Sequence, residues 1–576
     1  MVWGVWASPF DRANRHGPHK LALMPSTYIT TPIYYVNDRP HIGHCYTTLL
    51  ANCLARFERL RAGTGQGASS SPHATHDAPR AVFFLTGTDE HADKVVTSAA
   101  AHGMTAIQWA DRNADEFRKA FAFINASNDD FIRTTQDRHK SRVAAYMTAL
   151  LEAGDIYKGS YEGWYDDNQE EYLTDTVAKE QDFKSATTGR PLVRRKEECY
   201  FFRLSKYQQR LEELFAGNPG FVQPDARRNE VLGRFRDGLQ DIAASRPVTS
   251  DPATQFGIRV PGDEGHRIYV WIDALFNYLS VVDTDDRRHF WPPRVHFIAK
   301  DILWFHAVVW PAMLMALQES GGRFGFVGLP KTVYSHAYWV RDGKKMSKSL
   351  GNFVTIEVLQ AYAAKYSLDA LRWYLLTQGP LHATDADFSH AKFVEVYNAD
   401  LANGIGNCAS RVANMVEKYF GGKMPSGAAP GTAGVDFGGD ALARVRDAAS
   451  SADRLDLIAM LRAGKQLVDR IDAVIAETKP FTLAKDPANM DKVGHILFQC
   501  AEAVRIASIL LSPAMPEKMA QLWRAWNIAH GSGAGTPAAL EELSAFGGAH
   551  GLRPGHTITK GEALFMRADP AEAPPA

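Results

Sequence analysis

Strand-like and helix-like hydrophobic patterns alternate over the first part of the chain. Residues 28–36 are rich in threonine, isoleucine, tyrosine and valine, and residues 81–85 are almost wholly apolar, so both segments predict buried strands. From Ile42, apolar residues recur every three or four positions, which predicts a helix between these strands. Alternating strands and helices predict a doubly wound, Rossmann-like α/β domain with a parallel sheet.

The pattern changes twice further along. Residues 157–204 are polar and rich in turn-forming residues, which predicts an inserted module that splits the α/β domain. From Phe393 the pattern becomes helix after helix, which predicts an all-α bundle. Residues 1–24 are expected to be a disordered extension or a wrongly assigned start. The α/β domain is expected in two halves, 25–137 and 249–335, separated by the inserted module at 138–248. A linking region (336–392), the helical domain (393–560) and a closing segment with a disordered tail (561–576) are expected to follow.

The bulk composition is that of an ordinary globular protein. A chain of 576 residues with a net charge of −1 is long enough for about three to four domains and has no overall attraction for nucleic acid, so any such contact must use local basic patches. Five scattered cysteines without a CxxC pair favour a reducing compartment. The most apolar run, residues 302–317, contains His306 and Pro311 and is too short to span a membrane, so no membrane association is expected.

The first 23 residues differ in character from the rest of the chain. They contain Arg12, Arg15 and Lys20, but also Asp11, and they have no amphipathic period. We expect Met24 to be the true start, with a transit peptide as the alternative.

Two short motifs carry the candidate chemistry. His41 and His44 lie three residues apart at the start of the predicted helix, with Gly43 between them, so both rings share a face beside free backbone N–H groups. Such a helix start suits a phosphate, although two surface histidines are the commoner explanation of this pattern alone. Residues 343–352 read GKKMSKSLGN and predict a basic loop that can wrap a polyphosphate, or merely a solvated one.

HIGH and KMSKS, in this order, resemble the signature pair of class I aminoacyl-tRNA synthetases. Within that class the chain resembles the methionyl-tRNA synthetases, in family order over residues 31–411, in segments that include TPIYYVNDRPHIGH, FLTGTDEH, YVWIDALFNYL, KDILWFHAVVWPA and YNADLANGIGNCASR. The resemblance implies activation of L-methionine by ATP with Mg2+, and transfer from methionyl-adenylate to initiator and elongator tRNA(Met). It also implies that residues 336–392 contact the tRNA stem and that the helical domain binds the CAU anticodon.

The resemblance also implies individual residue roles. Asn403, Asn407 and Arg411 fall at i, i+4 and i+8, so one helical face would present them to the anticodon. Phe481 stands where the family usually has tryptophan, and its smaller ring would stack less strongly. The other implied residues are His41, His44, Lys345 and Lys348 in catalysis, these four with Gly43 and Asp301 for ATP, and Ile33, Tyr35, Asp89, Trp271, Ala274, Leu275, Tyr278, Ile302 and His306 for methionine.

The chain departs from the family pattern at several positions. Alanine replaces glycine at Ala92, Ala299 and Ala337; each adds a methyl group near the expected nucleotide site and disfavours a positive φ. Residues 166–195 contain neither cysteine nor histidine, so no structural zinc is expected. The additional tRNA-binding, dimer-forming module of some relatives is not expected at the C-terminal end, so a monomer is expected. The expected location is the cytoplasm, or an organelle if the N-terminal extension is real and the source is eukaryotic.

Three alternatives remain at this point. A class I synthetase for leucine, isoleucine or valine would usually be longer and carry a large editing insertion. A non-catalytic paralogue that binds tRNA or partners would be expected to lose HIGH or KMSKS first, yet both are present. An HxGH nucleotidylyltransferase would leave the long helical C-terminal part unexplained.

Overall fold

A six-stranded parallel sheet lies at the centre of the protein, a computed structural model of which describes residues 26–572 and 574, except 65–81, 167–170, 174, 187, 342, 347–351, 427–433 and 530–537. Every pair of neighbouring strands is parallel, and the sequence order reverses between the third and fourth, so the predicted doubly wound fold is confirmed. From edge to edge the strands are β3 (Asp130–Arg133), β2 (Val82–Asp89), β1 (Thr27–Tyr35), β12 (Val295–Ala299), β13 (Val333–His336) and β7 (Val222–Gln223). The predicted extension 1–24, with the choice between Met1 and Met24, lies outside the described residues.

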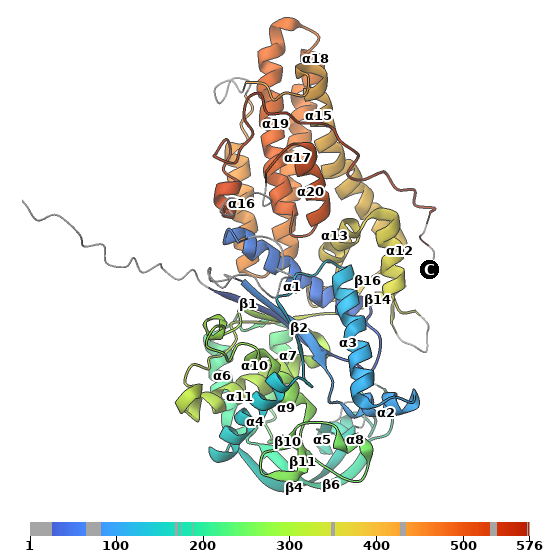
Figure 1. The fold of residues 1–576 in the computed structure, drawn as a ribbon, viewed down its shortest axis with the longest axis vertical. Helices are drawn as coiled ribbons and strands as arrows, with labels where there is room; N and C mark the ends of the chain where they lie inside the picture. The colour runs from blue at the N-terminus through green and yellow to red at the C-terminus, as the bar shows by residue number, and fades with distance from the viewer. Residues whose placement is uncertain are drawn as a thin grey trace, which may run out of the picture.

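Helix α1 (Ile42–Arg61) lies between the sheet and the helical bundle (Figure 1). Almost its whole surface is buried, including Arg56, Glu58 and Arg59. The periodicity of its sequence predicts a helix with one exposed polar face, and α1 has no such face. Its buried charges are paired, as burial requires: the Arg59 Nη2 lies 2.6 Å from the Asp129 Oδ2. The two bodies therefore share α1 as part of both cores.

The other helices of the α/β body pack around the sheet and its carboxyl edge. Helix α3 packs beside β2, and α4 packs against α10 and α11. The helices are α2 (Asp93–Ala101), α3 (Ala106–Phe123), α4 (Asp137–Glu152), α9 (Val270–Leu275), α10 (Asn277–Ser280) and α11 (Trp310–Glu319).

The antiparallel strands of the inserted module form the end of the molecule opposite the bundle (Figure 1). Its main sheet is antiparallel, in the order β5-β4-β6-β8. Helix α4 and strand β7 fall within the range 138–248 predicted for the module, but α4 packs against α10 and α11, and β7 pairs with β13 in the central sheet. The sequence did not indicate this, because α4 carries no boundary signal and β7 is only two residues long. The module's elements are β4 (Ile156–Asp166), β5 (Glu171–Leu173), α5 (Asp175–Glu180), β6 (Val193–Phe202), α6 (Gln208–Gly217), α7 (Asp225–Phe235) and β8 (Ile242–Ala243), followed by a small sheet of β9 (Ser245–Pro247), β10 (Arg259–Val260) and β11 (Asp263–Ile268).

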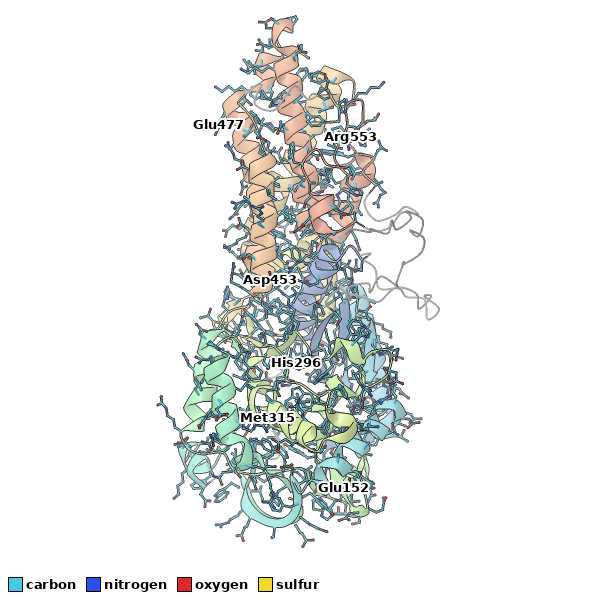
Figure 2. The ribbon with its side chains drawn as sticks, turned by 90° about the vertical axis from the view of Figure 1, so that its left-hand side faces the viewer. Glu152, His296, Met315, Asp453, Glu477 and Arg553 are labelled. Carbon is cyan, nitrogen blue, oxygen red and sulfur yellow. The ribbon has the colours of Figure 1, made fainter. Side chains whose placement is uncertain are left out.

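The helical bundle stands above the sheet, with Glu477 and Arg553 along it and Asp453 near its base (Figure 2). By length and composition, residues 487–511 could cross a membrane, but 94% of their most apolar window is buried in the bundle core. The helices from the linking region onward are α12 (Ile356–Tyr366), α13 (Leu368–Gln378), α14 (His390–Val396), α15 (Asn407–Phe420), α16 (Gly438–Asp453), α17 (Leu457–Thr478), α18 (Pro480–Leu483), α19 (Met490–Leu511), α20 (Pro516–Ala525) and α21 (Leu540–Leu543), with a π-helical stretch at Tyr397–Gly406.

The C-terminal segment differs from its prediction. Residues 561–567, the start of the expected closing segment, form neither helix nor strand. The chain instead runs back to the linking region, where the carbonyl of Glu572 accepts hydrogen bonds from the Lys365 Nζ (2.5 Å) and the Tyr366 hydroxyl (2.9 Å). The described part of the expected disordered tail is therefore anchored on α12.

One buried guanidinium joins the α/β body to the bundle. Arg372 on α13 donates hydrogen bonds to the carbonyls of Ile124 (2.6 Å) and Ala514 (2.8 Å), and to the side-chain oxygen of Asn52 (3.1 Å). The carbonyl of Pro513 also accepts from it, at 2.8 Å. Three segments that are distant in sequence thus depend on one side chain that is only 1% exposed.

We expect Arg372→Leu to lower the free energy of unfolding by about 3 kcal/mol or more, because several buried oxygens would lose their donor. Urea denaturation measures the loss. Arg470→Leu, which removes an exposed ion pair with Asp440, should cost about 0–1 kcal/mol. Equal losses in the two variants would contradict the role of Arg372 as the joint.

Candidate active site

A cavity of about 830 Å3 opens at the carboxyl edge of the sheet, where the strand order reverses. In doubly wound sheets this position is where ligands bind. The start of α1, the ends of β1, β2, β12 and β13, and helices α9 and α10 all contribute walls. Thirteen of the residues expected at the ATP and methionine sites line it: Ile33, Tyr35, His41, Gly43, His44, Asp89, Trp271, Ala274, Leu275, Tyr278, Asp301, Ile302 and His306.

The histidine pair forms a reciprocal cap at the start of α1. The Gly43 N–H donates to the His41 Nδ1 (3.1 Å), and the His41 N–H donates to the His44 Nδ1 (3.2 Å). The two rings lie 4.0 Å apart. A Cβ on residue 43 would come within 3.0 Å of the His41 ring, so the glycine makes room for the cap as well as for a ligand. The segment after the KMSKS loop also reaches this helix start, where the Ile42 N–H donates to the Val354 carbonyl.

This cap determines which ring nitrogen carries the proton. A nitrogen that accepts a backbone N–H bond is unprotonated, so each neutral ring carries its proton on Nε2. Burial lowers the pKa of His44 well below its usual value, and the neighbouring His41 lowers it further. The helix start therefore presents N–H donors, two of them from imidazoles, and the His44 ring is neutral at pH 7.

Aromatic rings and an uncharged polar pair form the opposite end of the cavity. Trp271 stacks on Phe305 with ring centroids 4.1 Å apart, and Tyr35 meets Trp271 edge-on at 6.0 Å. The Tyr278 hydroxyl pairs with the His306 Nε2 at 2.8 Å, and the His306 Nδ1 lies 3.0 Å from the Ile302 carbonyl. His306 therefore donates from Nδ1 and accepts at Nε2. Burial lowers its pKa to about 4, so this end is uncharged at neutral pH.

The carboxylates of the site lie between these two ends and at its edge. Asp89, at the end of β2, is 3% exposed and faces the cavity. Asp301, just after β12, is exposed toward the cavity. A buried carboxylate suits a cationic ligand group, whereas an accessible one suits hydroxyl groups.

The three alanines do not strain the backbone. Ala92 and Ala299 have φ of −72° and −86°, and Ala337 is not among the residues with positive φ. The backbone at these three positions therefore needs no positive φ, and the alanines meet no such conflict. The methyl groups of Ala299 and Ala337 do line the cavity, while Ala92 is buried beside it at the start of α2.

Sequence reasoning missed several residues that line the cavity. These residues are Tyr46, Asn277, His336, Tyr338 and Trp339. His336 ends β13 and Tyr338 follows it, so their position at the carboxyl end of a parallel strand was a usable signal. Tyr46 and Asn277 gave none, because their patterns are those of core helix residues.

Of the two lysines expected to act from the basic loop, the structure describes only Lys345, which is not among the residues that line the cavity. Lys345 is exposed on a short hairpin formed by β14 (Trp339–Arg341) and β15 (Lys344–Lys345). Lys348 lies outside the described residues. In the part of the chain that is described, no group of three or more histidine, cysteine, aspartate or glutamate residues could hold a metal ion. Part of 166–195 is not described, so the lack of a structural zinc stays a prediction.

A second candidate site lies on the bundle. Asn403 and Asn407 are exposed, and Arg411 is half-buried, with its guanidinium carbon 5.9 Å from the centre of the Phe481 ring, which is 42% exposed. The segment is not a regular α-helix throughout, because Asn403 lies in the π-helical stretch Tyr397–Gly406 and Asn407 begins α15; that one face presents these residues to the anticodon stays a prediction. Such π-helical turns often occur at functional sites.

Residues 27–181 and 178–413 match the sequence profile of a family described as tRNA synthetases class I (M). A methionine–tRNA ligase of Streptomyces coelicolor is 38% identical over 94% of this chain and 96% of its own length. One of Halalkalibacterium halodurans is 38% identical over 95% of this chain and 79% of its own.

The chain belongs to the methionyl-tRNA synthetase family. The structure agrees with this assignment: Mycobacterium tuberculosis methionyl-tRNA synthetase, solved in complex with methionyl-adenylate, has a TM-score of 0.79 and 31% identity, over 94% of this chain and all of that one. The HIGH motif shared with the synthetase family and the aromatic rings Tyr35 and Trp271 line the same cavity.

The burial of His306 predicts a pH dependence of stability. Its folded pKa of about 4 lies below the unfolded value of 6.5, so the unfolded state binds more protons between these values. Its contribution is complete above pH 6.5 and is lost as the pH falls toward 4. Between pH 8 and pH 5 we expect His306→Gln to lose about 2 kcal/mol less of its unfolding free energy than the wild type, measured by urea denaturation. Parallel pH profiles would contradict the buried neutral state.

Proposed function

We propose that the chain is a methionine–tRNA ligase that activates L-methionine with ATP and then charges initiator and elongator tRNA(Met). The observation that carries this proposal is a single cavity lined by the histidine-capped helix start, by an uncharged aromatic group and by the buried carboxylate Asp89. The family membership of the chain supports the same activity.

In the first step the methionine carboxylate attacks the α-phosphate of ATP, and pyrophosphate leaves. His41 and His44 donate Nε2–H bonds to phosphate oxygens, and they help most as charge builds in the transition state. Asp301 accepts bonds from the ribose hydroxyls. Lys345 and Lys348, by resemblance to the family, close over the leaving pyrophosphate. The phosphate charge would be neutralised by Mg2+ bound to ATP.

Methionine lies with its ammonium group near Asp89 and its side chain against the rings. A thioether has no charge and gains about 0.3–1.5 kcal/mol from a sulfur–aromatic contact. The neutral pair of Tyr278 and His306 suits it, since a charged imidazolium would favour a polar or anionic side chain. In the second step the terminal adenosine hydroxyl of the tRNA takes the methionyl group.

The bundle reads the anticodon in this proposal. Asn403 and Asn407 offer hydrogen bonds to base edges, and Arg411 and Phe481 offer a stacking surface for an unpaired base. We propose that the protein works as a monomer in the cytoplasm, where tRNA and ATP are both available.

The direct test is methionine-dependent exchange of pyrophosphate into ATP. The purified protein should show exchange with methionine and with none of the other nineteen amino acids, because an uncharged pocket disfavours polar side chains and only the methionine thioether combines a long apolar side chain with a sulfur–aromatic contact. Exchange with another amino acid at a comparable rate, or with none, would contradict the proposal.

His41→Asn separates catalysis from folding. The asparagine Oδ1 can still accept the Gly43 N–H, and asparagine is a good N-cap, so the unfolding free energy should change by less than about 1 kcal/mol. The Nε2–H donor is lost, so exchange should fall by about 10²–10³-fold. Exchange that stays within about tenfold of wild type would remove His41 from the phosphate site.

Asn407→Ala and Arg411→Ala test the anticodon site. We expect kcat/KM for tRNA charging to fall by about tenfold or more, with exchange unchanged, because one base contact is worth about 1–3 kcal/mol. Arg446→Ala, an exposed arginine on α16, controls for lost positive charge and should leave charging unchanged. An equal loss in all three variants would indicate general charge attraction instead.

A further inference from the structure

The methionine end of the cavity is assembled from two chain segments that lie on either side of the inserted module. Asp89 ends β2, before the module. Trp271 and Tyr278 lie on α9 and α10, after it. The separation between Asp89 and these rings decides which amino acid fits, yet no short stretch of backbone sets it.

A buried carboxylate joins the two segments. The Asp273 Oδ2 on α9 lies 2.6 Å from the Nδ1 of His91, two residues after Asp89. Its Oδ1 lies 2.8 Å from the Nε2 of His139 on α4, and the His139 Nδ1 lies 2.9 Å from the Ser280 hydroxyl on α10. The side chains of Asp273, His91 and His139 are at most 6% exposed. His91 and Asp273 are 182 positions apart, so the contact is wholly tertiary.

The end of β2 is held independently on its other side. Glu90, between Asp89 and His91, is fully buried and accepts two bonds from Arg133 on β3, at 2.7 and 3.0 Å. The Thr88 hydroxyl also donates to it. Asp89 therefore belongs to a frame that does not depend on Asp273. Asp273 links α9 and α10 to this frame, and the Tyr28 hydroxyl on β1 separately donates to the Tyr278 carbonyl on α10, at 2.9 Å.

We propose that Asp273 is a positioning residue for methionine recognition: through His91 and His139 it fixes α9 and α10, and with them the aromatic wall, at a set distance from Asp89. The inference rests on the proposed function, since it concerns the methionine end of the same cavity. The nucleotide end is built from the start of α1 and the ends of β12 and β13, so this link does not position it.

A purely structural role would give a different result. Removing a buried, paired carboxylate destabilises a protein wherever it lies. Stability would then fall, while the KM values for methionine and ATP would stay in proportion. A positioning role instead predicts that the KM for methionine rises while the KM for ATP stays nearly the same.

The test is Asp273→Asn, which keeps the shape of the side chain but loses the charge and one acceptor oxygen. In pyrophosphate exchange we expect the KM for methionine to rise about tenfold or more, since bonds to a charged group are weakened, and the KM for ATP to change less than about twofold. Glu502→Gln is the matched control: this carboxylate of α19 is fully buried and paired with Arg505 at 2.8 Å, far from the cavity. It should lower Tm and leave both KM values unchanged.

His91→Asn keeps the proposal testable if Asp273→Asn does not fold. It weakens only the link to the β2 frame and leaves the His139 contact in place, so the KM for methionine should again rise alone. An inactive wild-type protein would contradict the proposed function itself. If the wild type is active, two results would overturn the positioning role of Asp273. One is that the folded variants keep the wild-type KM for methionine, and the other is that they raise the KM values for methionine and ATP equally.

Discussion

The reciprocal cap at the start of α1 is the contact on which the geometry of the site depends. Each imidazole uses its Nδ1 to accept a backbone N–H, so the cap fixes the ring orientation and the proton position together. The helix itself is buried between the sheet and the bundle, so it cannot tilt without disturbing both cores. The donors that face a phosphate are thus preorganised before any ligand arrives, and electrostatic stabilisation of a transition state requires such preorganisation.

Burial then gives the two ends of one cavity different chemistry. At the helix start it keeps His44 neutral while its N–H remains a donor, and at the far end it keeps His306 neutral as the partner of Tyr278. Charged side chains also line the cavity, among them the carboxylates Asp89 and Asp301 and the cations Arg39 and Lys119. The cavity can therefore hold an anionic nucleotide, an ammonium group and an apolar thioether side by side, each against a matching surface.

Much of this arrangement could be predicted from the sequence because local patterns encode it. The strand at residues 28–36, the helix from Ile42 and the placement of Asp89 at the end of a strand all follow from periodicity and topology. The features that could not be predicted depend on long-range contacts. The cap through Nδ1, the joint at Arg372 and the link from Asp273 to His91 join segments that no local pattern connects. The π-helical stretch before Asn407 and the two-residue strand β7 were missed because each is too short or too irregular to leave a periodic signal.

The most direct measurement of the central claim is mass spectrometry of the ligand that the protein retains after incubation with ATP, Mg2+ and an equimolar mixture of all twenty amino acids, without tRNA. A cavity that holds nucleotide and methionine end to end should retain methionyl-adenylate and no other aminoacyl-adenylate. Retention of a different adenylate, or of none while ATP remains intact, would contradict the account of a single cavity that joins methionine to AMP.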